Sequence, residues 1–336
     1  MQVTNYGKSG AGRDLVAVQF GYAKSDQKER PLALISEGIH GDEYTNIVDR
    51  LPEVFQDLND NQGVKQFIDA GGLIYLVPIV NPDGYSNRRR ENNRGAELNR
   101  DFAIRAAGNN GFTQPETRAI RDFVAEKVKQ HSGQLEVSME YHCCIGGLIH
   151  PWAHAPKPLE PAAEKRHVEV GELVQKTFGY RYGTTRDIVG YSATGGSDDY
   201  YYETYGRRAF SFEGSFGREN QNLDKHVGMW NEIFANVAKD FATNNPEGKP
   251  HLAILGSRAG QVTLAVAVPQ EERSQLQLCR GNSCAPGSRL DLRYVKTLNG
   301  IAFYVTASPM SVAGSSARLV AQLATNRTWQ LELRSR

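Results

Sequence analysis

The sequence has few cysteines, no long hydrophobic run and no excess of charge of either sign. Its longest apolar run, Leu73–Val80, is far too short to span a bilayer. Residues 1–20 lack the apolar segment of a signal peptide, so we expect a cytoplasmic protein or a mature chain that restarts at Met1. Across 336 residues, 39 Lys+Arg balance 38 Asp+Glu, and the net charge of +1 gives no support to a nucleic-acid or acidic-membrane partner.

The four cysteines form two sequence pairs, and neither pair decides the compartment. Cys143 and Cys144 are adjacent, and such neighbours rarely bridge to each other. Cys279 and Cys284 enclose Arg-Gly-Asn-Ser, whose turn chemistry can bring the two thiols within bridging distance. Such a disulfide would favour a periplasmic or secreted protein over a cytoplasmic one, whereas two reduced thiols flanking a turn would not.

The composition is ordinary for a globular protein, with 40% hydrophobic and 23% charged residues. Over the first three-quarters of the chain, short apolar runs typical of strands alternate with helical patterns, which favours an α/β fold. The predicted strands are Leu15–Phe20, Leu32–Ile35, Leu73–Val80, Leu135–Met139 and Ala209–Phe212, and the predicted helices are Tyr44–Leu58, Glu116–Lys129, Glu164–Phe178 and Leu223–Phe241.

The pattern changes after Phe241. The turn-rich stretch 243–250 is typical of a linker, and short β-type segments follow it with no convincing helix among them. We therefore predict two domains, residues 1–246 and a small β-sandwich over residues 247–336.

The first segment that can carry chemistry places His40 and Glu43 where a predicted strand gives way to a helix. A His nitrogen and a carboxylate oxygen suit zinc, and this spacing can direct both at one point. By itself the pair is weak evidence, because a surface His beside a helix-capping acid has the same spacing. His142 ends the strand-like segment Leu135–Tyr141, and two His with one Glu form a catalytic zinc set with an open fourth position. The ordinary alternative for His142 is a satisfied core imidazole.

Two further segments carry polar residues at strand ends. Five arginines follow the Asn81-Pro-Asp-Gly84 turn at positions 88, 89, 90, 94 and 100, and they either hold a substrate anion or form a solvated basic loop. Glu213 ends an apolar strand, where a carboxylate is costly unless it faces a cleft or a charged partner. Beside a zinc site Glu213 would act as a general base, and otherwise it points into bulk water.

Taken in order, these segments resemble the zinc metallocarboxypeptidases of the carboxypeptidase A/B type, also called funnelins. The resemblance covers about residues 5–240. Any single piece is unspecific, but the ordered set is highly specific, with Tyr191 four residues before Gly195 and Glu213 eighteen after it. The matched pieces are Tyr6-Gly-Lys-Ser-Gly-Ala-Gly-Arg-Asp-Leu15, His40-Gly-Asp-Glu43, Asn81-Pro-Asp-Gly84, Arg90-Glu-Asn92, Asn99-Arg100, Gln114-Pro-Glu-Thr117, His142, Tyr191…Gly195-Gly-Ser197 and Glu213.

The resemblance implies a mixed sheet flanked by helices and one Zn²⁺ per chain, bound by His40, Glu43 and His142. It implies that Glu213 is the general acid/base. Arg90 is expected to polarise the scissile carbonyl, although other arginines lie near it in sequence.

The resemblance also implies how substrate is held. Asn99 and Arg100 match the pair that grips the substrate's terminal carboxylate, with Tyr191 closing over it. Asp198 matches the base of the specificity pocket, where basic-selective relatives carry Asp, so we expect a preference for Lys, Arg or a diaminopimelate-like side chain. In a competing arrangement Asp199 faces the pocket, or both acids face solvent at a helix N-terminus.

The sequence departs from the family pattern after the third ligand, where Cys143 and Cys144 replace a serine and its neighbour. These thiols are either reactive near zinc or partly buried and inert. The C-terminal region is similar to the small sandwich that follows the catalytic domain in regulatory carboxypeptidases, but no motif secures that match.

The leading prediction is hydrolytic removal of the C-terminal residue of peptides. A first alternative is a bacterial cell-wall carboxypeptidase or amidase that acts on murein peptides. A second is a binding protein that keeps the fold without catalysis. A third places the main role in the β domain, as a docking module for a partner or the cell wall.

Overall fold

The structure, a computed structural model, separates into two compact units, Met1–Ala238 and Lys239–Arg336. The predicted boundary at residue 246 falls in a stretch outside the described residues. Cys284 also lies outside them, so the Cys279–Cys284 disulfide stays a prediction. The described residues are 1–21, 30–131, 133–215, 222–243, 251–258, 261–269, 276–280, 288–298, 301–308, 310–311, 316–322 and 328–334.

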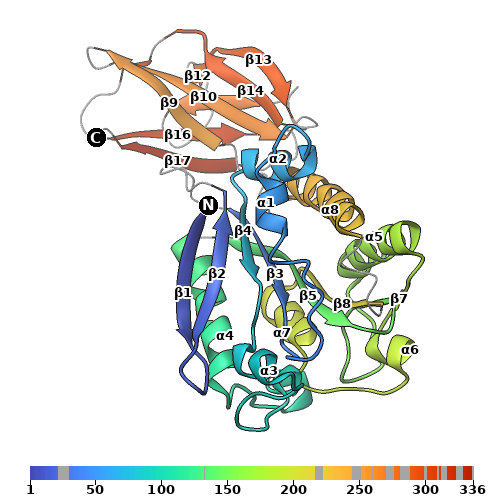
Figure 1. The fold of residues 1–336 in the computed structure, drawn as a ribbon. Coiled ribbons are helices and arrows are strands. Elements are labelled where there is room, and N and C mark those ends of the chain that lie inside the picture. Colours follow the sequence, from blue (N-terminus) through green and yellow to red (C-terminus); the bar gives the residue numbers. More distant parts are fainter. Residues whose placement is uncertain are drawn as a thin grey trace. The chain divides into compact units, whose positions relative to one another are not determined.

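An eight-stranded sheet forms the centre of the first unit (Figure 1). Its strands are β1 (Gln2–Lys8), β2 (Asp14–Phe20), β3 (Pro31–Glu37), β4 (Leu73–Val77), β5 (Gln134–Cys143), β6 (Gly147–Ile149), β7 (Arg181–Gly183) and β8 (Arg208–Gly214). The strand order is β1-β2-β4-β3-β5-β8-β6-β7. β3 pairs in parallel with β4 and β5, and β5 with β8, whereas the β1–β2, β2–β4 and β6–β8 pairs are antiparallel. The sheet is therefore mixed, as predicted.

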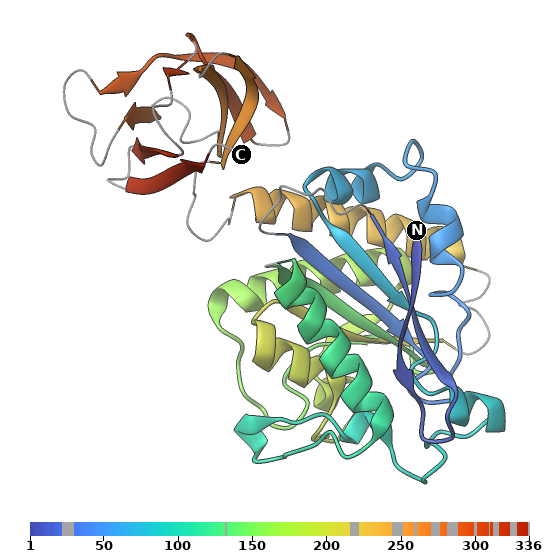
Figure 2. The same ribbon diagram turned by 90° about the vertical axis from the view of Figure 1, so that its left-hand side faces the viewer.

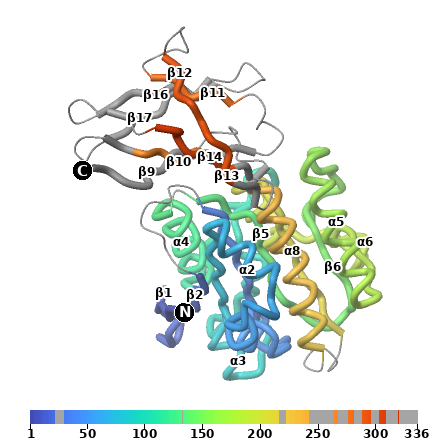
Figure 3. The backbone as a smooth tube through the Cα atoms, turned by 90° about the horizontal axis from the view of Figure 1, so that it is seen from above, coloured from blue at the N-terminus to red at the C-terminus, as the bar shows by residue number. Residues whose placement is uncertain are grey.

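Helices cover both faces of this sheet. They are α1 (Leu51–Phe55), α2 (Gln62–Asp69), α3 (Pro82–Asn87), η1 (Leu98–Arg100), η2 (Arg105–Ala107), α4 (Pro115–Gln130), α5 (Pro161–Phe178), α6 (Thr185–Val189), α7 (Ser197–Tyr205) and α8 (Leu223–Thr243). α4 and α7 lie on one face and α2 and α8 on the other (Figure 2). α5 and α6 lie near the β7 edge (Figure 1 and Figure 3). Because both faces are covered, β3 and β4 are buried along their whole length, which explains their continuous apolar runs.

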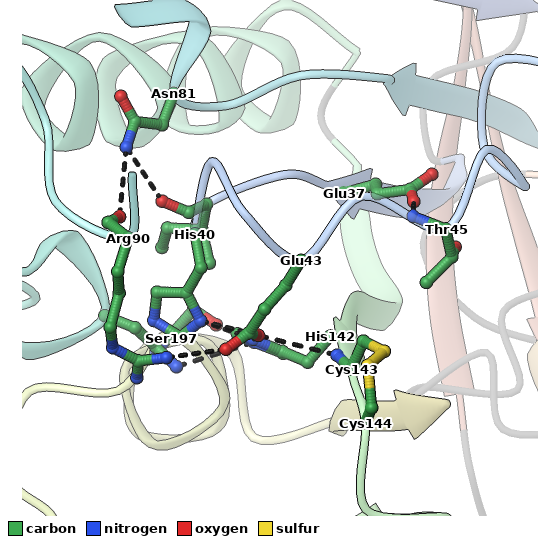
Figure 4. Close-up of polar contacts among 12 residues, drawn as sticks. Glu37, His40, Glu43, Thr45, Asn81, Arg90, His142, Cys143, Cys144 and Ser197 are labelled. Carbon is green, nitrogen blue, oxygen red and sulfur yellow. Dashed lines mark hydrogen bonds and ion pairs between the residues drawn. A yellow bond between two sulfur atoms is a disulfide. The ribbon is translucent and has the colours of Figure 1, made fainter. Parts of the chain in front are cut away.

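Three of the predicted helices are confirmed by α4, α5 and α8, but the prediction over Tyr44–Leu58 is wrong in its first half. The helix begins only at Leu51. The reason is Glu37 at the end of β3, whose buried carboxylate accepts the backbone N–H groups of residues 45, 46, 47 and 48. Figure 4 shows the bond from Thr45. Burial raises the pKa of Glu37, although these donors oppose the rise. A sequence pattern does not reveal such a buried acceptor, which holds the chain in a non-helical turn.

After the end of α8 at Thr243, the described part of the second unit is β-structure. Its strands are β9 (His251–Arg258), β10 (Gln261–Pro269), β11 (Gln277–Arg280), β12 (Arg289–Leu290), β13 (Leu292–Leu298), β14 (Ile301–Thr306), β15 (Met310–Ser311), β16 (Ser316–Gln322) and β17 (Thr328–Arg334). They form a sheet of order β13-β14-β10-β15, with β9 paired to β10, and a second of order β12-β11-β16-β17. This agrees with the predicted small β domain. None of the helices in the described part of the chain has the length and apolar character needed to cross a membrane.

Candidate metal centre and active site

The carboxyl ends of three neighbouring parallel strands carry the predicted site. β3 continues through a short turn to His40 and Glu43, β5 ends with His142 and Cys143, and Glu213 lies near the end of β8. His142 and Glu213 are register partners on adjacent strands. Ligands bind at this edge of open α/β sheets, and here it gathers residues that are far apart in sequence.

His40, Glu43 and His142 point toward one another (Figure 4), and one possible ligand atom of each lies within 4.8 Å of the others. Glu43 Oε2 is 2.8 Å from His40 Nδ1 and 3.4 Å from His142 Nδ1, and the two Nδ1 atoms are 3.2 Å apart. Ligand atoms around a tetrahedral zinc ion with bonds of about 2.0–2.2 Å are about 3.3 Å from one another. The donor set and its spacing therefore fit Zn²⁺, and three protein ligands are typical of a catalytic site.

Glu97 orients the first of these ligands, and the sequence analysis missed it. Its Oε1 lies 2.8 Å from His40 Nε2, so the other ring nitrogen of His40 faces Glu43. The same oxygen accepts the backbone N–H of Asn99 at 2.9 Å. Burial disfavours the charged form of Glu97, but His40 and Arg90 outweigh burial and lower its pKa to about 2. The available signal was an acid two residues before the matched Asn99-Arg100 pair.

Arg90 is held between two carboxylates. Its Nη1 lies 2.6 Å from Glu43 Oε1, and its Nε lies 2.6 Å from Glu97 Oε2. The Asn81 amide fixes the backbone of this loop by donating to Arg90 O at 3.4 Å and to Ile39 O at 3.1 Å (Figure 4). Burial lowers the pKa of Arg90, but Glu97 and Glu43 together raise it beyond its ordinary value. Arg90 therefore lies beside Glu43, one of the three candidate zinc ligands, and its role at the scissile carbonyl stays a prediction.

His142 and Glu213 share a buried, acid-rich environment. Burial disfavours the charged imidazole, yet hydrogen bonding to Glu43 and the nearby Glu213 and Glu140 raise the pKa of His142 to about 9. Burial also raises the pKa of Glu213, and its Oε2 has no hydrogen-bond partner among the described residues. A carboxyl group that holds its proton more tightly than usual is suited to proton exchange near neutral pH.

A cavity that is partly open to solvent borders these residues, with a volume of about 430 Å³ including that open space, and Glu213, Arg90 and Arg100 line it. Arg100 Nη1 donates to the carbonyl oxygen of Asn99 at 2.7 Å. Tyr191 also lines the cavity and is 54% exposed, so most of its ring is in solvent. The structure thus brings the predicted anion-binding residues to the same cavity as the predicted acid/base.

Asn99 and Asp198 also line the cavity. Asn99 Nδ2 lies 3.5 Å from His142 Nε2, and its Oδ1 accepts the N–H of Ser197 at 3.0 Å. Asp198 is only 3% exposed, and its Oδ2 has no hydrogen-bond partner in the described part of the chain. Burial raises the pKa of Asp198, and the neighbouring carboxylate of Asp199 adds to the rise.

Asp199 is occupied elsewhere, so the alternative in which it faces the pocket is wrong. Its Oδ1 accepts the N–H of Ala153 at 2.7 Å, and its Oδ2 lies 2.6 Å from His154 Nδ1. Asp199 therefore ties the segment before α5 to the first turn of α7.

Cys143 and Cys144 form a disulfide with each other, contrary to the expectation of separate thiols. The turn that ends β5 brings their sulfur atoms together directly after His142 (Figure 4). The backbone N–H of Cys143 lies 3.4 Å from Glu43 Oε2, so this disulfide lies beside the three candidate zinc ligands.

A family model described as zinc carboxypeptidase matches residues 1–239. The chain belongs to the zinc carboxypeptidase family. Among curated relatives, carboxypeptidase B from Helicoverpa zea is 24% identical over 239 residues, which are 59% of this chain and 54% of the relative. The inactive metallocarboxypeptidase ECM14 from Ajellomyces dermatitidis is 23% identical over 230 residues, which are 58% of this chain and 38% of that protein.

Solved structures support the same fold. Carboxypeptidase A from Helicoverpa armigera superimposes with a TM-score of 0.58 at 18% identity, covering 70% of this chain and 68% of that one. The family and fold class predicted from the sequence are thereby confirmed. The chain spans about half the length, or less, of the first curated relatives that it matches.

Proposed function

We propose that this zinc carboxypeptidase family member removes the C-terminal residue of peptides by zinc-dependent hydrolysis. The proposal rests on one observation, the convergence of a three-residue ligand set, the Glu213 carboxylate and the Arg100 guanidinium at a single cavity. The presence of a candidate ligand set, base and anion-binding group at one cavity supports a catalytic role over that of an inactive binding protein.

His40, Glu43 and His142 would hold the zinc ion, which when bound polarises the scissile carbonyl and lowers the pKa of the attacking water. Glu213 takes the proton of that water at its Oε2 and later delivers it to the leaving amine. The guanidinium of Arg90 stabilises the negative charge that develops on the carbonyl oxygen. Because two carboxylates already hold Arg90 in place, it needs little reorganisation to do so.

Arg100 and Asn99 account for action at a chain end. Only a C-terminus offers a free carboxylate to the guanidinium fork, and an internal peptide bond would leave Arg100 unpaired. Tyr191 lines the same cavity from an exposed position and would close over the bound residue.

Asp198 supports a preference for a basic C-terminal side chain. A buried carboxylate with one oxygen, Oδ2, left without a partner is costly, and a Lys or Arg side chain in the cavity would supply a cation for it. The distal amino group of diaminopimelate would supply the same charge, so murein peptides remain the second candidate substrate.

Product analysis of a mixed peptide library by mass spectrometry tests the proposal. We expect single C-terminal residues to be released, mainly Lys and Arg, with activity removed by a chelator and restored by zinc. Endoproteolytic products would overturn it. Release of diaminopimelate from murein peptides, with no action on Lys-ended peptides, would replace the substrate by the second candidate.

A further inference from the structure

We propose that Arg88 and Arg89 form a second, anion-binding subsite beside the catalytic cavity, which favours peptides with an acidic residue on the amino side of the scissile bond. This inference rests on the proposed peptidase function. It concerns the substrate residues on the amino side of the scissile bond, whereas Asp198 would bind the C-terminal side chain.

The two arginines lie on a segment packed onto the metal-binding turn. The start of α3 approaches Gly41 so closely that a Cβ at that glycine would lie 2.0 Å from the carbonyl carbon of Gly84. The backbone N–H of Arg89 donates to the carbonyl oxygen of Gly84 at 2.9 Å, which fixes the turn after α3. Since each residue spans at most about 3.6 Å, the Cα of Arg88 is within about 7 Å of that of Arg90.

The charges of Arg88 and Arg89 are not balanced by neighbours. Both side chains are exposed, and neither forms an ion pair among the residues that the structure describes. Arg90 differs, because two carboxylates already pair with it. Asp42 is exposed nearby but acts on Arg90, and Glu91 is half-buried without an ion pair in the described ranges. The segment therefore presents two exposed arginines, with no ion-pair partner among the described residues, to an approaching peptide.

The backbone of Arg88 is an independent observation. As the C-cap residue of α3 it has a φ of 51°, in the left-handed region where glycine is favoured. An arginine is disfavoured there relative to glycine, which points to a role for its side chain. The turn itself would form at least as readily without that charge.

The test compares two peptides with the same C-terminal Lys and either Glu or Gln at one of the three positions before the scissile bond. In wild type we expect kcat/KM to favour the Glu peptide roughly two- to tenfold at low salt, as for exposed ion pairs. The preference should vanish at about 1 M salt, where charges are screened within about 3 Å. The double variant Arg88→Gln/Arg89→Gln should lose the preference and keep wild-type activity on the Gln peptide.

Arg94→Gln is the matched control, because Arg94 is an exposed arginine of the same loop beyond the turn at Asn92–Ala96. It should retain the Glu preference. Equal kcat/KM for the two peptides in wild type, or an unchanged preference in the double variant, overturns the subsite. If wild type cleaves neither peptide, the proposed function fails. Equilibrium binding of the same two peptides then tests the subsite, and equal affinities for them would overturn the subsite.

Discussion

Asp198→Asn removes a carboxylate that lines the cavity and keeps the volume of the side chain. Asp198 is 3% exposed and its Oδ2 lacks a partner among the described residues, so a bound Lys or Arg would be its counter-charge. A hydrogen bond to a charged group contributes about 1.5–3 kcal/mol, which corresponds to roughly 10- to 150-fold in rate. We expect kcat/KM for Lys- and Arg-ended peptides to fall by that factor, while Phe-ended peptides change little.

The ratio of kcat/KM for Lys- and Phe-ended peptides gives a second readout. Burial, and then the Asp199 carboxylate, raise the pKa of Asp198, so the wild-type ratio should shrink as the pH falls through that raised pKa. Steps common to both substrates, including proton transfer by Glu213, cancel in the ratio. In Asp198→Asn the ratio should not depend on pH through this group.

Thermal unfolding provides the control for folding. Because the pKa of Asp198 is raised in the folded state, that state binds the proton more tightly than the unfolded chain does. The contribution of Asp198 to the free energy of unfolding therefore falls as the pH rises from the ordinary Asp pKa through the raised one. We expect Asp198→Asn to be at least as stable as wild type at neutral pH. A wild type that favours Phe, or an Asn variant that keeps the Lys preference, would refute the reasoning.

Three further predictions concern the metal, the base and the fold. His142→Ala should lose stoichiometric zinc and activity, and full zinc occupancy by metal analysis would contradict the ligand assignment. Glu213→Gln should keep zinc and substrate binding but lose about 10²–10⁴-fold in kcat, whereas turnover within a few-fold of wild type would remove Glu213 from the mechanism. Glu37→Ala should destabilise the first unit by about 3 kcal/mol or more in thermal or denaturant unfolding, because several buried backbone N–H groups lose their acceptor. Unchanged unfolding would mean that those N–H groups find other partners.

The parts of the site that sequence could predict are those with fixed spacing inside one segment. His40 and Glu43 are three residues apart, and His142 ends an apolar strand, so chain position alone brought them into consideration. Glu37 and Glu97 act instead on groups whose position only the folded chain determines. Glu37 accepts backbone N–H groups, and Glu97 reaches His40 from a turn that follows a different strand. Backbone donors carry no residue signature, which is why Glu37 did not stand out, and Glu97 is 57 residues away from His40 in the sequence.

Asp198 and Asp199 show the same limit within a single motif. Both acids lie in the first turn of α7, where the helix dipole favours a carboxylate at either position. The sequence therefore does not indicate which of the two faces the cavity. Consecutive helical residues point about 100° apart, since a turn takes 3.6 residues, and here Asp198 lines the cavity while Asp199 binds Ala153 and His154. Asp199 accepts the N–H of Ala153, which itself lines the cavity, and so holds part of the wall of the cavity that Asp198 also lines. The two acids therefore cannot exchange roles, and Asp199 cannot rescue a variant that lacks the carboxylate at position 198.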